Sequence, residues 1–559
     1  MSKLTNPNIV TTPLGALEGS AEDGLRVFRG VPFARPPVGE LRFKSPRPLA
    51  PWDGVRQAKV AGLASYQMNL ANAEQIFDEV KTIDPGVPGI PAWPGYVGKT
   101  YNQDNVGEDC LYLDMWVPEA KPDSKLPVYV YYHGGANAVS SGSFEVERGE
   151  NLAKQEDIII VRPNYRMGAL GWVHFGLISD EFPEAINLGI QDQIAALKWV
   201  YDNIESFGGD KDNITIGGES AGATAVSHLM TNPDSRQYFK RAILQSLSPF
   251  NVWCTQQKEE AVVVAEKYIE LLGIKNLSDL NDLDPTKFLA AQNVLTRFCD
   301  PDDNVAWRPL GGVIDGNWIR EAPAQYLSQR NLGESQQALM IGFAKDEWQF
   351  FRGHSETIKN GTETQAIAVL AQIFGDARAK ELFDGYSQLY PDHKRPGHVL
   401  SDIMSFEFFK FSSLAIAKNF ASQGVPIHVF EFAYDLPGWD GDLRAVHTGD
   451  MPFLWRNLTE KDLQQWPGFD GTDREELKRV SDDMGKLYAA FIRNGEPGLT
   501  WKRFDEDTQT VLWFGTQVHT KERLLTAEWN LFVRHGAENV PALEDLLVKN
   551  LREKLKLRK

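Results

Sequence analysis

Short runs of consecutive apolar residues are the feature that most constrains how this chain can fold. They lie at 126–132, 157–161, 214–216, 241–244, 338–341 and 426–432. Consecutive apolar residues, unlike alternating ones, are typical of strands that are covered on both faces. Helical patterns separate these runs, and in 189–203 the side chains of Ile190, Ile194 and Leu197 fall on one apolar stripe. The alternation predicts an α/β fold: a large, mostly parallel central sheet with helices on both faces and a functional site at the carboxyl ends of its strands.

The chain is long, but its length does not require two separate folds. It has 559 residues, of which 42% are apolar and 24% charged, so it can bury a large core and extend one sheet by insertions. We therefore expect residues 1–559 to form a single domain with insertions. The Pro-, Gly- and Asn-rich segment 64–105 is expected to be a long surface loop. The helical regions 259–303 and 357–420 are expected to form cap insertions near the site.

The acidic composition argues against several classes of partner. A formal net charge of −18 opposes binding to nucleic acid, and solubility explains this charge more simply than the steering of a cationic substrate. The sequence has no signal peptide and no stretch apolar enough to span a bilayer, so we expect a cytoplasmic protein. It contains no zinc-spaced Cys/His cluster and no phosphate-binding loop with Lys, so no metal and no organic cofactor is expected. A monomer and a homodimer are both compatible with the sequence.

Ser220 lies between two glycines, where a predicted strand meets a predicted helix. The run Gly218-Glu-Ser-Ala-Gly222 follows the apolar residues 214–216 and precedes an alanine-rich helical pattern. A nucleophile on such a sharp turn needs small neighbours, because a Cβ two residues away would collide with the adjoining chain. The helix start also brings backbone N–H groups close to the serine, where they can stabilise negative charge. The pattern predicts a nucleophilic serine, with a glycine-rich loop as the alternative.

Longer motifs around this serine carry a family resemblance. Residues 207–222 (FGGDKDNITIGGESAG) resemble the signature of type-B carboxylesterases, a group that includes cholinesterases and bacterial para-nitrobenzyl esterases. Residues 108–118 (EDCLYLDMWVP) look like the second signature of that family. Further similar motifs lie at 29–39, 164–171 and 187–193. The resemblance implies an α/β-hydrolase fold and a serine hydrolase that acts on small-molecule carboxylic esters through an acyl-enzyme.

The serine needs two partner side chains, because a hydroxyl group is a weak nucleophile until a correctly oriented base takes its proton. In this architecture the acid follows the serine in the chain and the histidine comes last. Glu347 follows the predicted strand 338–341 and matches the family's catalytic acid, with neighbouring Asp346 as the alternative by chemistry alone. His447 follows the predicted strand 426–432 and resembles the family's catalytic base. The resemblance therefore implies a triad of Ser220, Glu347 and His447.

The loop that follows strand 126–132 resembles the oxyanion loop of the family. His133-Gly-Gly-Ala136 matches its His-Gly-Gly-Gly motif, which implies N–H donors from Gly135, Ala136 and Ala221. Ala136 replaces a glycine, so its φ and ψ decide how well it donates. The expected substrate pocket comprises Glu219, Phe250, Trp253, Trp348 and Trp455. Trp93, in the long loop, is a weaker candidate for an indole that binds a cation.

Cys110 has no upstream cysteine with which to pair. The corresponding cysteine of secreted relatives forms a disulfide, and Ser65 stands where we expect its partner. The missing partner agrees with an intracellular protein. Two alternatives to an ester hydrolase remain. An amidase, a carbamate hydrolase or a lactone-opening enzyme would use the same triad, whereas an adhesion protein of this fold would lack a triad member.

Overall fold

The computed structural model describes most of the chain. The described residues are 6–69, 72–83, 105–119, 125–247, 255–296, 309–329, 338–353, 355–393, 395–464, 466, 468–498 and 500–534. Phe250 and Trp253, which we expected in the substrate pocket, and Trp93 lie outside these ranges.

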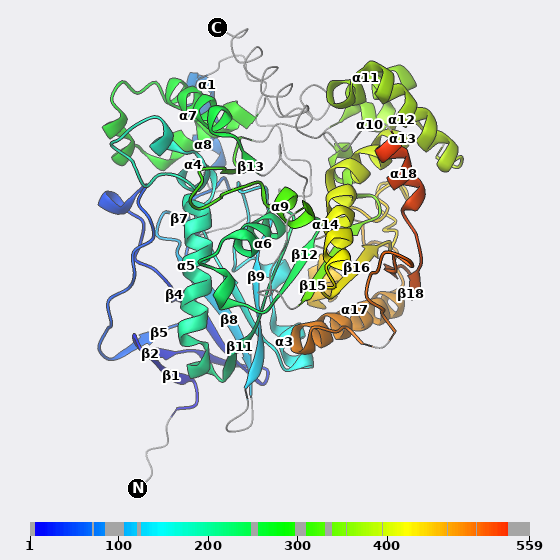
Figure 1. The fold of residues 1–559 in the computed structure, drawn as a ribbon. Helices are drawn as coiled ribbons and strands as arrows, with labels where there is room; N and C mark the ends of the chain where they lie inside the picture. The colour runs from blue at the N-terminus through cyan, green and yellow to red at the C-terminus, as the bar shows by residue number, and fades with distance from the viewer. Residues whose placement is uncertain are drawn as a thin grey trace.

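Within the described residues, a mixed sheet of eleven strands forms the centre of the molecule (Figure 1). In chain order, its strands are β3 (Ser20–Glu22), β4 (Leu25–Pro32), β8 (Tyr112–Pro118), β9 (Leu126–Tyr132), β10 (Ile159–Pro163), β11 (Gly209–Glu219), β12 (Arg241–Gln245), β15 (Ala338–Ala344), β16 (Ile427–Phe432), β17 (Val511–Phe514) and β18 (Val518–Lys521). Their order across the sheet is β18-β17-β16-β15-β12-β11-β9-β10-β8-β4-β3. Neighbours from β17 to β10 pair in parallel, and the antiparallel pairs lie at the two edges. The predicted mostly parallel sheet is confirmed.

Alternate residues of the central strands enter two different hydrophobic cores. In β9, Val128 and Val130 belong to the first core, whereas Tyr129 and Tyr131 belong to the second. All four side chains are fully buried. Successive side chains of a strand point to opposite faces of the sheet, so a strand covered on both faces needs apolar residues at consecutive positions.

Helices cover both faces of this sheet (Figure 1). The first core contains side chains of α5 (Leu188–Asn203), α6 (Ala221–Thr231) and α14 (Phe411–Ser422). The second core contains side chains of α3 (Glu150–Glu156) and α17 (Arg474–Asn494) on the other face. This arrangement confirms the predicted layers. None of the helices within the described ranges is long and apolar enough to cross a membrane.

Two further groups of helices lie in the regions 259–303 and 357–420 (Figure 1). The described part of 259–303 contains α7 (Lys258–Leu272) and α8 (Pro285–Thr296). Region 357–420 contains α10 (Glu356–Asn360), α11 (Glu363–Phe374), α12 (Asp376–Leu389), α13 (Pro396–Ser405) and α14. Residues Phe406–Lys410, between α13 and α14, form a π-helix. Such turns are rare and occur frequently at functional sites.

The segment 64–105 differs from the long loop that its composition suggests. Its described part includes a short strand, β6 (Ala64–Ser65), and an eleven-residue helix, α1 (Ala73–Ile83). Ile76 and Val80 lie on one side of α1 and pack against Leu289 and Val294 of α8 in a third, small core. The composition of the whole segment hides this short amphipathic pattern. Residues 84–104 lie outside the described ranges.

Candidate active site

Four loops meet at the carboxyl edge of the parallel strands. The loop with Gly135 follows β9, Ser220 follows β11, Glu347 comes after β15, and His447 comes after β16. These strands are close neighbours, with only β12 between β11 and β15. Because parallel strands end at the same edge of a sheet, residues far apart in the sequence come together there.

Ser220 lies on a sharp turn between β11 and α6. Its φ of 56° and ψ of −123° are unfavourable for any residue with a Cβ. Its backbone N–H donates to the carbonyl oxygen of Gln245 at 3.0 Å. A Cβ on Gly218 would lie 2.4 Å from the backbone of Gly222, and a Cβ on Gly222 would lie 2.0 Å from the carbonyl oxygen of Tyr132. The turn therefore requires both glycines of the motif.

His447 and Glu347 form a buried pair. Nδ1 of His447 lies 2.5 Å from Oε2 of Glu347, and their side chains are only 6% and 0% exposed. The other ring nitrogen, Nε2, lies 3.2 Å from Oε1 of Glu219, the residue that precedes Ser220. The backbone N–H of Ala344 donates to the second carboxylate oxygen of Glu347 at 2.7 Å. The acid is thus fixed by one contact to the histidine and one to the end of β15.

Carboxylates around His447 favour its charged form. Burial lowers the pKa of His447, but the carboxylates of Glu219 and Glu347 outweigh this effect and raise that pKa to about 9. Burial in turn raises the pKa of Glu219 well above its usual range. Asp450, which accepts a hydrogen bond from Nε2 of Gln245 at 2.9 Å, also has its pKa raised by burial, to about 6. The site can therefore stabilise the imidazolium that forms when a histidine takes a proton from a nucleophile.

The predicted oxyanion loop lies against the serine. A Cβ on Gly134 would be 3.2 Å from the Cβ of Ser220. Gly135 and Ala136 both have positive φ values, 98° and 53°. An L-residue adopts this left-handed conformation at a cost of about 1–2 kcal/mol. Ala221 is the first residue of α6, where backbone N–H groups have no partner within the helix.

Asn137 anchors this loop, a role that the sequence alone did not reveal. Its Nδ2 donates to the carbonyl oxygen of Leu310 at 2.9 Å, and its own carbonyl oxygen accepts from the N–H of Gly168 at 2.7 Å. Further along the loop, Ser140 exchanges two hydrogen bonds with the side chain of Gln67, at 2.8 and 2.9 Å. These contacts hold the turn in which Ala136 takes its unfavourable φ.

Comparison with known proteins agrees with this geometry. The model of the family described as "Carboxylesterase family" matches residues 6–532. The chain belongs to the carboxylesterase family. This carboxylesterase is 31% identical to phenmedipham hydrolase from Pseudarthrobacter oxydans over 523 residues, which cover 92% of this chain and 96% of the relative. It is 29% identical to para-nitrobenzyl esterase from Bacillus subtilis, with 91% and 95% of the two chains covered.

Solved structures give the same relationship. A carboxylesterase from Geobacillus stearothermophilus superimposes with a TM-score of 0.77 at 28% identity, covering 94% of this chain and 99% of that one. The resemblance to type-B carboxylesterases and the predicted α/β-hydrolase fold are confirmed. The chain is accordingly a carboxylic ester hydrolase.

Two tryptophans that we expected in the pocket of this carboxylesterase lie in its hydrophobic cores. Trp348 is 1% exposed and stacks on Phe408, with ring centroids 4.7 Å apart. Trp455 is fully buried in the second core and meets Tyr131 edge to face at 4.8 Å. Neither side chain is exposed to solvent. The sequence shows that both positions are aromatic, but not toward which side each ring turns.

Two phenylalanines contact His447. The rings of Phe350 and Phe409 lie 5.6 and 5.0 Å from the imidazole of His447. Phe350 is three residues after Glu347, so the sequence already places it close to the proposed acid. Phe409 belongs to the π-helix, and no sequence signal connected it with the histidine. Together they make an apolar wall beside the imidazole of this carboxylesterase.

Cys110 of the carboxylesterase is fully buried beside Ser65. Burial raises the pKa of the Cys110 thiol to about 12, although the contact with Ser65 lowers it. Ser65 also accepts a hydrogen bond from the N–H of Met167 at 2.8 Å. Ser65 therefore stands next to Cys110, where we expected the position of the missing disulfide partner. Within the described part of the chain, no three His, Cys, Asp or Glu side chains are arranged to hold a metal ion.

Proposed function

We propose that this carboxylesterase cleaves small-molecule carboxylic esters through an acyl-enzyme on Ser220, with His447 as the general base and Glu347 as the acid that orients it. The 2.5 Å contact between Nδ1 of His447 and Glu347 carries the proposal. An ionised carboxylate only accepts hydrogen bonds, so this contact keeps a proton on Nδ1, and in the neutral imidazole Nε2 is then the nitrogen that accepts the proton of the serine.

The first half of the reaction forms the acyl-enzyme. Oγ of Ser220 attacks the ester carbonyl carbon while its proton passes to Nε2 of His447. The carbonyl oxygen becomes an oxyanion that accepts hydrogen bonds from the N–H groups of Gly135, Ala136 and Ala221. The C–O bond to the alcohol then breaks, and the imidazolium returns its proton to the leaving oxygen.

The second half releases the acid. A water molecule gives a proton to His447 and attacks the acyl carbon, and a second tetrahedral intermediate forms in the same oxyanion site. The bond to Oγ of Ser220 breaks as His447 gives back the proton, which restores the serine. The carboxylates of Glu219 and Glu347, which raise the pKa of His447, favour both halves, because each half passes through the imidazolium.

The test replaces the nucleophile and compares it with a serine of the adjoining helix. Ser220→Ala should reduce hydrolysis of para-nitrophenyl acetate by at least about 10³-fold. Ser227→Ala is the matched control, because Ser227 lies within α6 and its hydroxyl donates only to the carbonyl oxygen of Thr224 at 2.7 Å. A fluorophosphonate probe should label the wild type and Ser227→Ala at Ser220, as read by peptide mass spectrometry. Full turnover by Ser220→Ala would overturn the proposal.

The leaving group is a separate question, because amides, carbamates and lactones can react at the same triad. One relative is named a phenmedipham hydrolase, so phenmedipham belongs in the hydrolysis panel with an ester, an amide and a lactone. We expect the simple ester to be cleaved fastest. The alternative of a non-catalytic adhesion protein predicts a missing triad member, and this chain retains the serine, the glutamate and the histidine.

A further inference from the structure

Asp346, the residue before the proposed acid, has a buried carboxylate that the proposed mechanism does not use. Its side chain is only 1% exposed. Burial raises the pKa of Asp346, and the nearby cations of Arg444 and Lys345 lower it. An isolated charge in such a position would be strongly unfavourable. The ionised form of Asp346 therefore depends on its cationic neighbours, of which Arg444 is the closer.

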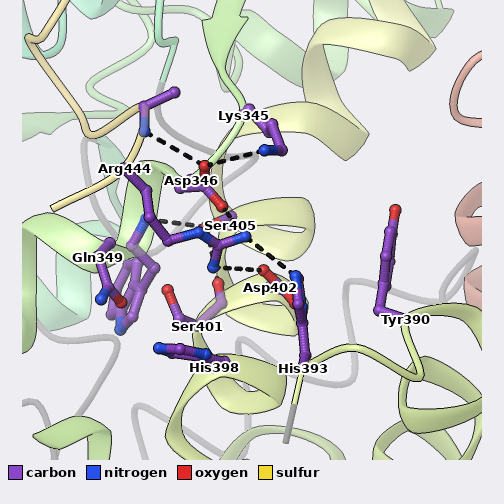
Figure 2. Close-up of polar contacts among 12 residues, drawn as sticks. Lys345, Asp346, Gln349, Tyr390, His393, His398, Ser401, Asp402, Ser405 and Arg444 are labelled. Carbon is purple, nitrogen blue, oxygen red and sulfur yellow. Dashed lines mark hydrogen bonds and ion pairs between the residues drawn. The ribbon is translucent and has the colours of Figure 1, made fainter. Parts of the chain in front are cut away.

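Residues 444 and 445 bind Asp346 through three contacts. Figure 2 shows Arg444 beside Asp346. Nη2 of Arg444 lies 2.6 Å from Oδ1 of Asp346. The N–H of Ala445 donates to Oδ2 at 3.3 Å, and the N–H of Asp346 donates back to the carbonyl oxygen of Ala445 at 2.9 Å. The segment that leads into Glu347 is thus tied to the segment that leads into His447.

The backbone around Arg444 is strained and closely held. Arg444 has a φ of 62°, and Thr448, just after the histidine, has a φ of 67°. Arg444 also exchanges two backbone hydrogen bonds with Leu436, both of 3.2 Å. Non-glycine residues stay in this left-handed region only when their surroundings impose it. The position of His447 therefore depends on what Arg444 binds.

Helix α13 contacts both the segment that leads into His447 and the turn that bears Glu347 (Figure 2). Nη1 of Arg444 lies 3.6 Å from Oδ1 of Asp402, and its Nη2 donates to Nε2 of His393 at 3.2 Å. Nδ1 of His393 in turn contacts Asp402. The N–H of Trp348, directly after the acid, donates to Oγ of Ser405 at 2.8 Å. Asp402 and Ser405 both belong to α13, so one helix braces the base-bearing loop and the acid-bearing turn.

We propose that Arg444 is a positioning residue for hydrolysis, which joins the acid-bearing and base-bearing segments through Asp346 and braces them against Asp402. This inference rests on the proposed triad. A guanidinium suits the task because its planar group can face two carboxylates at once, whereas an ammonium is a single point of charge. Arg444 touches no reacting atom and acts only by fixing the approach of His447 to Glu347.

A second buried arginine is needed to distinguish a positioning role of Arg444 from a merely structural one. Arg456 offers one, because it too has a left-handed φ, 59°, and a buried side chain. Its Nη2 lies 2.7 Å from Oε1 of Glu156. Glu156 belongs to α3, and neither partner contacts the residues of the proposed triad in the described structure. Arg456→Gln should therefore show the effect of losing a buried ion pair without disturbing the residues of the proposed triad.

The experiment measures kcat, KM and melting temperature for Arg444→Gln, Arg444→Lys and Arg456→Gln with para-nitrophenyl acetate. Arg444→Gln should lose about 10- to 100-fold in kcat because the acid and base are displaced. Its KM should stay within about 3-fold, because no substrate contact is removed. Arg444→Lys should recover part of kcat by restoring a cation beside Asp346. Arg456→Gln should lower the melting temperature comparably while keeping kcat near that of the wild type.

A double mutant tests whether the effect passes through Asp346. In the Asp346→Asn background, Arg444→Gln should lower kcat by less than about 3-fold, since the two residues act as one unit. The inference is overturned if Arg444→Gln keeps wild-type kcat, if Arg456→Gln loses kcat equally, or if the two effects multiply in full. If Arg444→Gln does not fold, the kcat of Arg444→Lys is compared with that of Arg456→Lys. The inference is then overturned if Arg444→Lys keeps the wild-type kcat or if Arg456→Lys loses kcat equally. An inactive Ser220→Ala beside an unaffected Arg444→Gln would reject this inference alone, whereas an active Ser220→Ala would reject the proposed function.

Discussion

Replacing Glu219 with glutamine would remove one negative charge beside His447 and keep the size of the side chain. Oε1 of Glu219 lies 3.2 Å from Nε2 of His447, and the two side chains are 3% and 6% exposed, so solvent screens the pair weakly. With an effective dielectric constant of about 20, two unit charges at this distance would interact by about 5 kcal/mol. This is an upper limit, because burial raises the pKa of Glu219 and so reduces its charge.

Opposite charges at such distances shift a pKa by about 1–3 units, and we expect the lower half of this range. The pKa of His447, raised to about 9 in the wild type, should therefore fall in Glu219→Gln. The base must be neutral to accept the serine proton, so the rate declines as the pH falls through the pKa of His447. The acid limb of kcat/KM should move to lower pH by about 1–2 units. Its plateau should also be lower, because the imidazolium loses a stabilising charge.

The assay is a pH-stat measurement of kcat/KM between about pH 5 and pH 10, which spans the ordinary and the raised pKa of a histidine. Glu205→Gln is the control, because Glu205 is 47% exposed and its charge is screened by solvent. That variant should keep the wild-type profile. An acid limb that stays in place, or moves to higher pH, in Glu219→Gln would refute the argument that Glu219 sets the pKa of His447.

Two further predictions follow from burial and from close packing. Cys110, whose thiol pKa is raised to about 12 by burial, should resist iodoacetamide in the native protein and react after denaturation; peptide mapping that finds rapid native labelling at Cys110 would contradict this. Gly222→Ala should abolish fluorophosphonate labelling and lower the melting temperature, because the new Cβ would lie 2.0 Å from the carbonyl oxygen of Tyr132. Gly424→Ala is its control, since that glycine has a positive φ but no atom within 4 Å of the added Cβ, and it should keep full labelling.

The sequence predicted the fold because the strands of this protein are covered on both faces. Consecutive apolar residues such as Val128 to Val130 can be read directly, and the parallel sheet then brings the loops after β9, β11, β15 and β16 to one edge. The helix α1 was missed because its apolar residues are few and the surrounding composition is that of a loop. Its stability comes from packing on α8, which no local pattern reveals.

The site was predictable as far as the motifs reach. The sequence offered Asp346 and Glu347 as adjacent carboxylates, and only the match to the family motif favoured Glu347. In the structure Glu347 contacts His447, whereas Asp346 contacts Arg444. The contact of Phe409 with His447 could not be foreseen, because a π-helix changes the direction of every side chain after it. Trp348 lies in the first hydrophobic core, which the sequence could not reveal, because an aromatic residue beside such a motif fits a pocket and a core equally well.

The left-handed turn at Ser220 sets thermal stability against activity. Holding a residue with a Cβ at a φ of 56° costs about 1–3 kcal/mol, a noticeable part of the roughly 5–15 kcal/mol that separates folded from unfolded domains. Glycine would relieve this strain but has no hydroxyl group. A search for hardier variants that is scored by melting temperature alone would therefore favour replacing the very residue that we propose as the nucleophile, so directed evolution of this enzyme needs a selection for turnover at every round.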